Sequence, residues 1–327
     1  MKVFQGLVNY GTQAGFFAKG LRNKGIIAIS AVYSHTDKYN RQTDVILKLV
    51  SKSVLSITYR LCFFIKCLLK YNIFHFYFGL TLLPKQLDLY FYRLMGKKAV
   101  FHYLGADVDI KRDPADFPGE KIDINRKLKR LKNETRFADM QFVCAPCYSE
   151  FVEKSKVMPL AIDINTYSYT PMNNNEEIIF VHAPTRVKYK KTEYIENAIQ
   201  RLKNEGYKFK YKRVTGVSHK QLLEEYKSCD VVIDQLNNWY GTVSVEAMAI
   251  GRPVVCGYWK EYFKYIDYGE QIPLINASID NIYNVLKDIL DKKYDLHQIS
   301  KKSRKFVEEV HELNALTNKL IEYYKQL

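Results

Sequence analysis

The chain has 327 residues, 47% of them hydrophobic and 26% charged, which is typical of a globular protein long enough to form two buried cores. Its 50 Lys and Arg against 35 Asp and Glu give a formal net charge of +15, which favours anionic partners: nucleotide phosphates, nucleic acid or an acidic membrane surface. We expect neither a secretory signal, because the apolar run at the N-terminus is too short, nor a membrane-spanning helix, because charges interrupt every long apolar stretch.

The N-terminal residues have the pattern of a βαβ unit, with a strand at residues 2–8, a helix that ends at Leu21 and a second strand at residues 26–32. The first turn contains Gly11 and Gly15. Their spacing is not G-x-G-x-x-G, so the sequence does not support a nicotinamide-binding fingerprint. Gly11 is still a candidate for close approach of the backbone to another ligand.

Residues 48–98 are basic and aromatic. They contain nine Lys and Arg residues and one acid, Asp88, with many Phe, Tyr and Leu residues in between. Such a surface suits an anionic lipid interface, which is the interpretation we favour. Two alternatives stay open: the apolar residues belong to the core while the cations form a solvated face, or the segment binds nucleic acid, although no recognised binding motif accompanies the charge.

Two more strands are expected at residues 73–77 and 98–105. Ligands of parallel sheets bind at the carboxyl ends of the strands, which places His102 where chemistry would occur. A histidine at such a place is also commonly a hydrogen-bonded core residue. Asp107 and Asp109 have the D-x-D spacing of some metal-dependent sugar transferases, but two acids in a loop are common by chance and we expect no metal there.

Two of the six cysteines, Cys144 and Cys147, have the C-x-x-C spacing of redox sites and of half a zinc site. A zinc site needs a second ligand pair at similar spacing, and none follows in the sequence. The pair stands where a strand at residues 141–143 is expected to meet a helix. We therefore interpret these cysteines as reduced and structural.

A domain boundary is expected near Pro159, because that proline and the polar run at residues 173–176 interrupt the pattern. The two predicted domains comprise residues 1–160 and 161–327. The second repeats the alternation, with strands at residues 178–182, 209–214, 230–234 and 252–256, and helices at residues 192–204, 220–228 and 241–250. A helical region from residue 279 onward is long enough to fold back over the first domain.

The helix at residues 241–250 is expected to bind an anion at its N-terminus. The backbone N–H groups of Gly241, Thr242 and Val243 precede the first intrahelical hydrogen bonds, and the helix dipole favours negative charge there. Glu246 is the one acid of an otherwise apolar helix. Either it only favours the helix N-terminus, or it accepts hydrogen bonds from a ribose diol while the N–H groups hold a diphosphate.

The loop after the strand at residues 178–182 carries four cations, among them Arg186 and Lys190. A charge run is usually a solvated loop. This loop, however, leaves the same edge of the predicted sheet as the helix at residues 241–250 begins. Cations and N–H groups that converge on one point make a diphosphate site.

These motifs resemble those of the family 4 glycosyltransferases, retaining enzymes with the GT-B architecture of two Rossmann-like domains that face each other across a cleft. In the second half, the likeness lies in residues 182–186, 190–192, 230–234, 240–241 and 246–254. In the first half, a looser likeness lies in residues 101–107 and 158–163.

The resemblance implies that Arg186 and Lys190 hold the donor phosphates, that Glu246 holds the ribose and that His102 lies near the transferred sugar. The family usually has a second acid eight residues before Glu246, where this sequence has Asn238. Asparagine can hydrogen-bond sugar hydroxyls but cannot stabilise positive charge at the anomeric carbon.

Asp234 and Trp239 stand near Asn238 in the sequence and are candidates for the same sugar pocket. The fold we expect is α/β of the GT-B type, with the last helix packed back on the N-terminal domain. The function implied by the resemblance is metal-independent, retaining transfer of a sugar from a nucleotide diphosphate, most commonly a UDP-sugar, to a glycan or lipid-linked acceptor.

That function suits bacterial cell-surface polysaccharide synthesis by a cytoplasmic protein that is peripheral on the inner face of the membrane, with no cofactor besides the donor substrate. Two other functions stay open. One is a nucleotide-sugar epimerase of the same shape. The other is a basic membrane- or nucleic-acid-binding protein with a degenerate site, of which nucleic acid is the less favoured partner.

Overall fold

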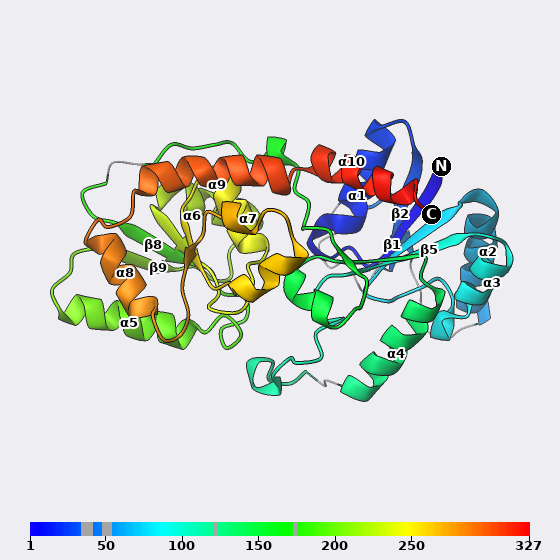
Figure 1. Cartoon of the computed structure of the whole chain (residues 1–327), viewed down its shortest axis with the longest axis horizontal. Helices are drawn as coiled ribbons and strands as arrows, with labels where there is room; N and C mark the ends of the chain where they lie inside the picture. Colours follow the sequence, from blue (N-terminus) through cyan, green and yellow to red (C-terminus); the bar gives the residue numbers. More distant parts are fainter. Residues whose placement is uncertain (34–41, 48–53, 121–122, 173–174) are drawn as a thin grey trace. The chain divides into compact units, whose positions relative to one another are not determined.

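The computed structural model of the chain describes residues 1–33, 42–47, 54–120, 123–172 and 175–327. They form two α/β units, each built around its own parallel sheet (Figure 1). Unit 1 comprises Met1–Arg112, Asp123–Ile162 and Leu313–Leu327, and unit 2 comprises Asp113–Ile122 and Asp163–Glu312. The predicted fold class is confirmed: both sheets are parallel, and the last helix belongs to the N-terminal unit.

Unit 1 contains a seven-stranded sheet in the order β3-β2-β1-β4-β5-β6-β7 within the described residues. All of its neighbouring strands pair in parallel. The strands are β1 (Lys2–Leu7), β2 (Ile27–Tyr33), β3 (Val45–Leu47), β4 (Ile73–Tyr77), β5 (Lys98–Tyr103), β6 (Met140–Val143) and β7 (Lys156–Val157).

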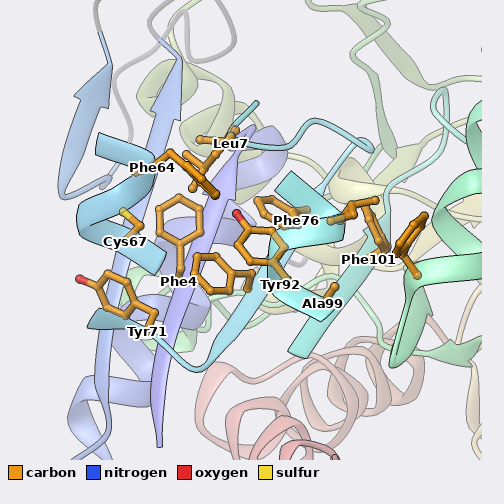
Figure 2. Packing of buried hydrophobic residues seen from close by; sticks show 14 of the residues in the cluster. Phe4, Leu7, Phe64, Cys67, Tyr71, Phe76, Tyr92, Ala99 and Phe101 are labelled. Atoms are coloured by element: carbon orange, nitrogen blue, oxygen red, sulfur yellow. The ribbon is translucent and has the colours of Figure 1, made fainter. Parts of the chain in front are cut away.

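The two faces of this sheet carry different helices, because successive strand residues point to opposite sides. Phe4, Phe76 and Phe101 lie on one face and pack against α2 (Val54–Lys70), α3 (Asp88–Leu94) and α4 (Ile124–Phe137). Figure 2 shows this cluster, with Phe64 of α2 and Tyr92 of α3 against the strand residues.

The opposite face is covered by α1 (Gln13–Asn23) and the C-terminal α10 (Leu313–Tyr324). These helices lie close together at Gly20: a Cβ atom there would be 2.1 Å from Thr317 Oγ1. Glycine therefore permits the close packing of α10, which anchors the end of the chain in unit 1.

Unit 2 contains a five-stranded parallel sheet in the order β12-β11-β10-β8-β9 in the part of the chain that the structure describes. Its strands are β8 (Ile179–His182), β9 (Lys210–Arg213), β10 (Val231–Ile233), β11 (Val254–Cys256) and β12 (Ile275–Asn276). The strand order reverses at β8, with β9 on one side and β10 on the other. Ligands of open α/β sheets bind at such a switch point, outside the carboxyl ends of the strands.

The helices of unit 2 also divide between the two faces of its sheet. One face packs against α5 (Thr192–Asn204) and α8 (Ile282–Leu290). The remaining helices are α6 (His219–Ser228), α7 (Thr242–Ile250) and α9 (Leu296–Val310), and α7 packs against both α6 and α9. The predicted C-terminal helical region is thus three helices, α8, α9 and α10, the last of which belongs to unit 1.

The D-x-D motif that begins at Asp107 and the C-x-x-C motif of Cys144 and Cys147 have the contacts of structural residues. The Asp107 carboxylate accepts hydrogen bonds from the backbone N–H groups of Leu104 and Gly105 and so closes a turn after β5. All six cysteines are free, and burial raises the pKa of the Cys144 and Cys147 thiols. Both cysteines are therefore protonated thiols at neutral pH.

Candidate functional site

The site is built on the adjacent carboxyl ends of β8 and β10. His182, the last residue of β8, pairs in register with Ile233, the last residue of β10. Its Nδ1 donates to the Ile233 carbonyl at 2.8 Å, and its Nε2 accepts from the Thr192 hydroxyl at 2.9 Å. Burial lowers the pKa of His182 to about 4, so the ring is neutral and ties β8, β10 and the start of α5 together.

A chain of polar contacts connects the cation loop (residues 183–191) to the first turn of α7. Lys190 Nζ lies 2.5 Å from Asp234 Oδ1, at the end of β10. The Ser244 hydroxyl of α7 donates to Asp234 Oδ2 at 2.6 Å. The Asn237 side-chain amide also donates to the Tyr189 carbonyl at 2.6 Å. Asp234 therefore joins the Lys190 end of the cation loop to the first turn of α7 within unit 2.

The Lys190–Asp234 pair is buried, with Lys190 only 6% exposed. Burial by itself would raise the pKa of Asp234, but the Lys190 ammonium and the Ser244 hydroxyl outweigh it, and the pKa falls below its ordinary value. Asp234 is therefore a charged residue that connects Lys190 to Ser244 inside the site. Because its side chain is buried, it does not line an open sugar pocket. An ammonium has three N–H donors, so Lys190 retains donors beyond the one used by Asp234.

The N-terminus of α7 offers open space at Gly241. Gly241 is the N-cap residue, and the first bond of the helix runs from the Val245 N–H to the Gly241 carbonyl. The N–H groups of Thr242 and Val243 precede this bond, and both residues are partly exposed. A Cβ atom at Gly241 would meet nothing within 4 Å, and its φ of −125° suits any residue. Neither conformation nor packing within the chain requires glycine here.

An acidic segment, residues 113–120, lies on the cation loop and belongs to unit 2 although it precedes α4 in the sequence. Both carboxylate oxygens of Asp116 contact Lys191 Nζ, at 2.7 and 2.9 Å. Glu120 lies 3.2 Å from Arg186, whose guanidinium stands over the Phe117 ring. Sequence reasoning missed this segment, because no local pattern indicates a partner so distant in the chain.

Glu246 lies one turn into α7 and is buried. Its Oε1 accepts hydrogen bonds from the Tyr167 hydroxyl at 3.0 Å and from His219 Nε2 at 2.9 Å. The first turn of α7 contains no acid, so the alternative that Glu246 only favours the helix N-terminus is wrong. Tyr167 and His219 were missed as partners, since each comes from a different element.

Asn238 and Trp239 lie in the loop that leads to α7. The Asn238 carbonyl accepts from the Trp259 N–H at 3.2 Å, and its side chain is partly exposed. Trp239 is buried and stacks on Tyr240, with ring centroids 5.1 Å apart. Asn238 therefore remains available to a ligand, whereas Trp239 is part of the core of unit 2.

Two predicted site residues belong to unit 1. Gly11 has a φ of 55° and its carbonyl accepts from Gln13 Nε2 at 2.8 Å. His102 is 1% exposed, between Phe17 and Phe142, and neither ring nitrogen makes a hydrogen bond of normal geometry. Burial lowers its pKa to about 3, against a smaller opposing effect of the Met158 backbone. The structure places His102 in the core.

No group of three or more His, Cys, Asp or Glu side chains in the described ranges could hold a metal ion. The site brings together cations, backbone N–H donors and the Glu246 carboxylate, whose Oε1 accepts from Tyr167 and His219, while Asp234, Asp116 and Glu120 pair with the cations. Such a set suits a diphosphate next to a hydroxyl-bearing group.

No protein-family profile matches the sequence, and no curated protein matches it. Solved structures do match. HepE of Anabaena, in complex with UDP and glucose, is similar over 100% of both chains, with a TM-score of 0.66 and 14% identity. Sucrose-phosphate synthase of Thermosynechococcus elongatus has a TM-score of 0.65 and 15% identity, over 97% of this chain and 92% of its own.

A putative UDP-N-acetylglucosamine 2-epimerase of Listeria monocytogenes is similar over 100% of this chain and 96% of its own, with a TM-score of 0.55 and 12% identity. At these identities the likeness is one of fold. The chain has the fold of the GT-B glycosyltransferases, with two parallel-sheet α/β units.

Proposed function

We propose that the protein is a retaining glycosyltransferase that moves a hexose or related sugar from a UDP-sugar to a glycan or lipid-linked acceptor, as in bacterial cell-surface polysaccharide synthesis. The Lys190–Asp234–Ser244 contacts carry this proposal, because they join the cation loop to the open N-terminus of α7. The structure of HepE with UDP and glucose, which shares the fold, supports the choice of donor.

In this proposal Arg186, Lys190 and the α7 N-terminus together bind the diphosphate, and Lys190 is joined to α7 through Asp234 and Ser244. The N–H groups of Thr242 and Val243 donate to phosphate oxygens, and Gly241 leaves the space for them. Preorganised cations and N–H groups stabilise the departing diphosphate in the transition state, each contact contributing roughly 3 kcal/mol. No metal ion is part of the proposed mechanism.

Glu246 and Asn238 bind the two sugars of the donor. Glu246 accepts hydrogen bonds from the ribose diol on Oε2, while Tyr167 and His219 fix the carboxylate through Oε1. Asn238 hydrogen-bonds the transferred sugar and adds no charge at its anomeric carbon. His102 is buried in the core of unit 1, so the proposal assigns it no contact with the sugar.

The proposed reaction breaks the bond between the anomeric carbon and the β-phosphate oxygen, and forms a bond to the acceptor oxygen on the same face of the sugar. The acceptor's proton passes to the departing phosphate oxygen. The step needs no protein nucleophile and no general base, consistent with a site in which Asp234 is held by Lys190.

The test begins with UDP, GDP and ADP in a thermal-shift assay, in which a bound nucleotide raises Tm by mass action. Labelled UDP-sugars with crude lipid and glycan acceptors then report transfer. Arg186→Ala and Glu246→Gln are expected to lower transfer at least tenfold. Arg201→Ala, on the exposed side of α5 with its ion pair to Glu205 at 3.1 Å, is the matched control and should leave transfer unchanged.

Two outcomes would overturn the proposal. Interconversion of donor isomers without any acceptor would identify an epimerase, an alternative favoured by the fold of the Listeria protein. The absence of any nucleotide-dependent rise in Tm, together with binding to polyanions that falls steeply with salt, would identify a basic binding protein with a degenerate site.

A further inference from the structure

Helices α2 and α3 of unit 1 carry large apolar side chains that are exposed in the described chain. On α2, Ile57, Leu61, Ile65 and Leu69 follow one another at intervals of four residues and form a stripe along one side of the helix. On and before α3, the exposed apolar side chains are Leu87, Tyr90, Phe91 and Leu94. Leu69 is 71% exposed and Leu94 is 84% exposed.

These residues are additional to the faces by which both helices pack on the sheet. Leu68 of α2 and Leu89 of α3 are buried in the core of unit 1. So are Phe64 of α2 and Tyr92 of α3, which Figure 2 shows. Phe91 contacts Phe64 with ring centroids 5.7 Å apart, so the two helices are neighbours, as Figure 1 shows. We call their joint outer side the α2–α3 surface. Single exposed apolar residues are ordinary, but two neighbouring apolar stripes mark an interaction site.

The charge of this region has one sign. Residues 54–98 contain seven Lys and Arg and one acid, Asp88. Asp88 is buried and accepts hydrogen bonds from the Thr81 hydroxyl and the Leu82 N–H. Lys66 and Lys70 are exposed next to Ile65 and Leu69 in the sequence. Lys48 and Lys52, which the sequence analysis included in the basic region, lie outside the described residues.

We propose that the α2–α3 surface binds an anionic lipid bilayer, with its apolar side chains in the acyl boundary and its cations at the headgroups. A bilayer supplies both an apolar phase and negative charge. A second copy of the chain does not, because a symmetric contact through this surface would place like charges opposite each other. The proposed contact is interfacial. In the described residues no helix is long and apolar enough to cross a membrane.

Vesicle binding tests this proposal without donor or acceptor, so its outcome does not depend on the proposed function. The full chain is sedimented with vesicles of phosphatidylglycerol and, separately, of phosphatidylcholine. We expect binding to the first that weakens with salt, and much weaker binding to the second. The double variant Leu69→Asp with Leu94→Asp should lower the vesicle affinity at least tenfold, because it removes two apolar side chains whose transfer from water into the bilayer favours binding.

Lys66→Glu with Lys70→Glu should also lower the affinity at least tenfold, since each cation near an anionic surface contributes about a fivefold gain. The matched controls are in unit 2: Ile279→Asp, also an exposed apolar residue, and Lys301→Glu with Lys302→Glu, both exposed on α9. They should bind as the wild type does. Because every altered side chain is exposed, circular dichroism and Tm should stay unchanged.

Three results would overturn the proposal. The first is a wild type that sediments with neither kind of vesicle. The second is α2–α3 variants that bind as the wild type does, or unit 2 controls that lose as much affinity. The third is a dimer in sedimentation velocity that Leu69→Asp and Leu94→Asp dissociate, without vesicle binding, which would assign the surface to a second copy.

Discussion

The Lys190–Asp234 pair allows the structural and the phosphate-binding roles of Lys190 to be separated. Lys190→Met removes the ammonium and leaves the buried Asp234 carboxylate without its cation. Removal of one partner from a buried ion pair costs about 3–5 kcal/mol. For a unit of this size, that loss lowers Tm by about 10 °C.

The double variant Lys190→Met with Asp234→Asn removes both charges. An uncharged replacement of a buried pair is often close to neutral. In the wild type the Ser244 hydroxyl donates to Asp234 Oδ2 at 2.6 Å. The amide oxygen introduced at position 234 can still accept this hydrogen bond. We therefore expect the double variant to regain most of the stability that each single variant loses. Calorimetry of the wild type, both single variants and the double variant measures the coupling energy.

UDP titration of the stable double variant then isolates the phosphate contact. Loss of a hydrogen bond from a charged donor costs about 1.5–3 kcal/mol, so UDP affinity should fall about tenfold or more. Additive losses of stability in the cycle would refute the pairing. Unchanged UDP affinity in a folded double variant would refute the phosphate role of Lys190 and leave it as a structural tie.

Three other predictions follow from the site and the core. Gly241→Ala should change the free energy of unfolding by less than about 1 kcal/mol, because a Cβ atom there meets nothing within 4 Å. The same variant should lower UDP affinity at least tenfold in calorimetric titration. Asp116→Asn with Glu120→Gln frees Lys191 and Arg186 from carboxylates and should raise UDP affinity several-fold in the same assay. The free energy of unfolding should fall as the pH drops below 6.5, because the unfolded state protonates His102 and His182 there while burial keeps their folded pKa values at about 3 and about 4. Each contributes a decline that steepens toward about 1.4 kcal/mol per pH unit well below pH 6.5, measured by urea titration between pH 7 and pH 5.

These three predictions have distinct controls and refutations. If Gly241→Ala binds UDP normally, the diphosphate does not lie at the α7 N-terminus. If the Asp116 and Glu120 variant binds UDP more weakly, the acidic segment helps to form the site and does not compete with the ligand. His102→Phe should make the acid decline shallower, since it removes one titrating group from an aromatic environment. An unchanged slope would show that His102 is not buried in solution.

Local patterns in the sequence were sufficient to predict the α/β architecture. Apolar runs of strand length alternate with helical periods, and this alternation is a property of neighbouring residues that already specifies parallel α/β units. The rule that ligands bind at strand carboxyl ends then placed the cation loop and the α7 N-terminus at one edge. In the structure Asp234 links Lys190 of that loop to Ser244 of α7.

Only the tertiary structure decided how the charged and apolar side chains are used. A lysine has the same local pattern whether it is solvated or paired, so the sequence did not reveal that Asp234 holds Lys190 or that Asp116 holds Lys191. His102 stands at a strand end, as predicted, yet lies in the core because α1 and α10 cover that face.

For the apolar residues of α2 and α3, too, the sequence determined one property and the tertiary structure decided another. The sequence alone determined that this region is basic and rich in apolar residues, and it left core and surface roles open. Which of these residues are buried depends on the faces that the helices turn to the sheet, and this is fixed by contacts between residues far apart in the chain. Packing against the sheet buries Phe64 and Tyr92 and leaves Leu69 and Leu94 in solvent.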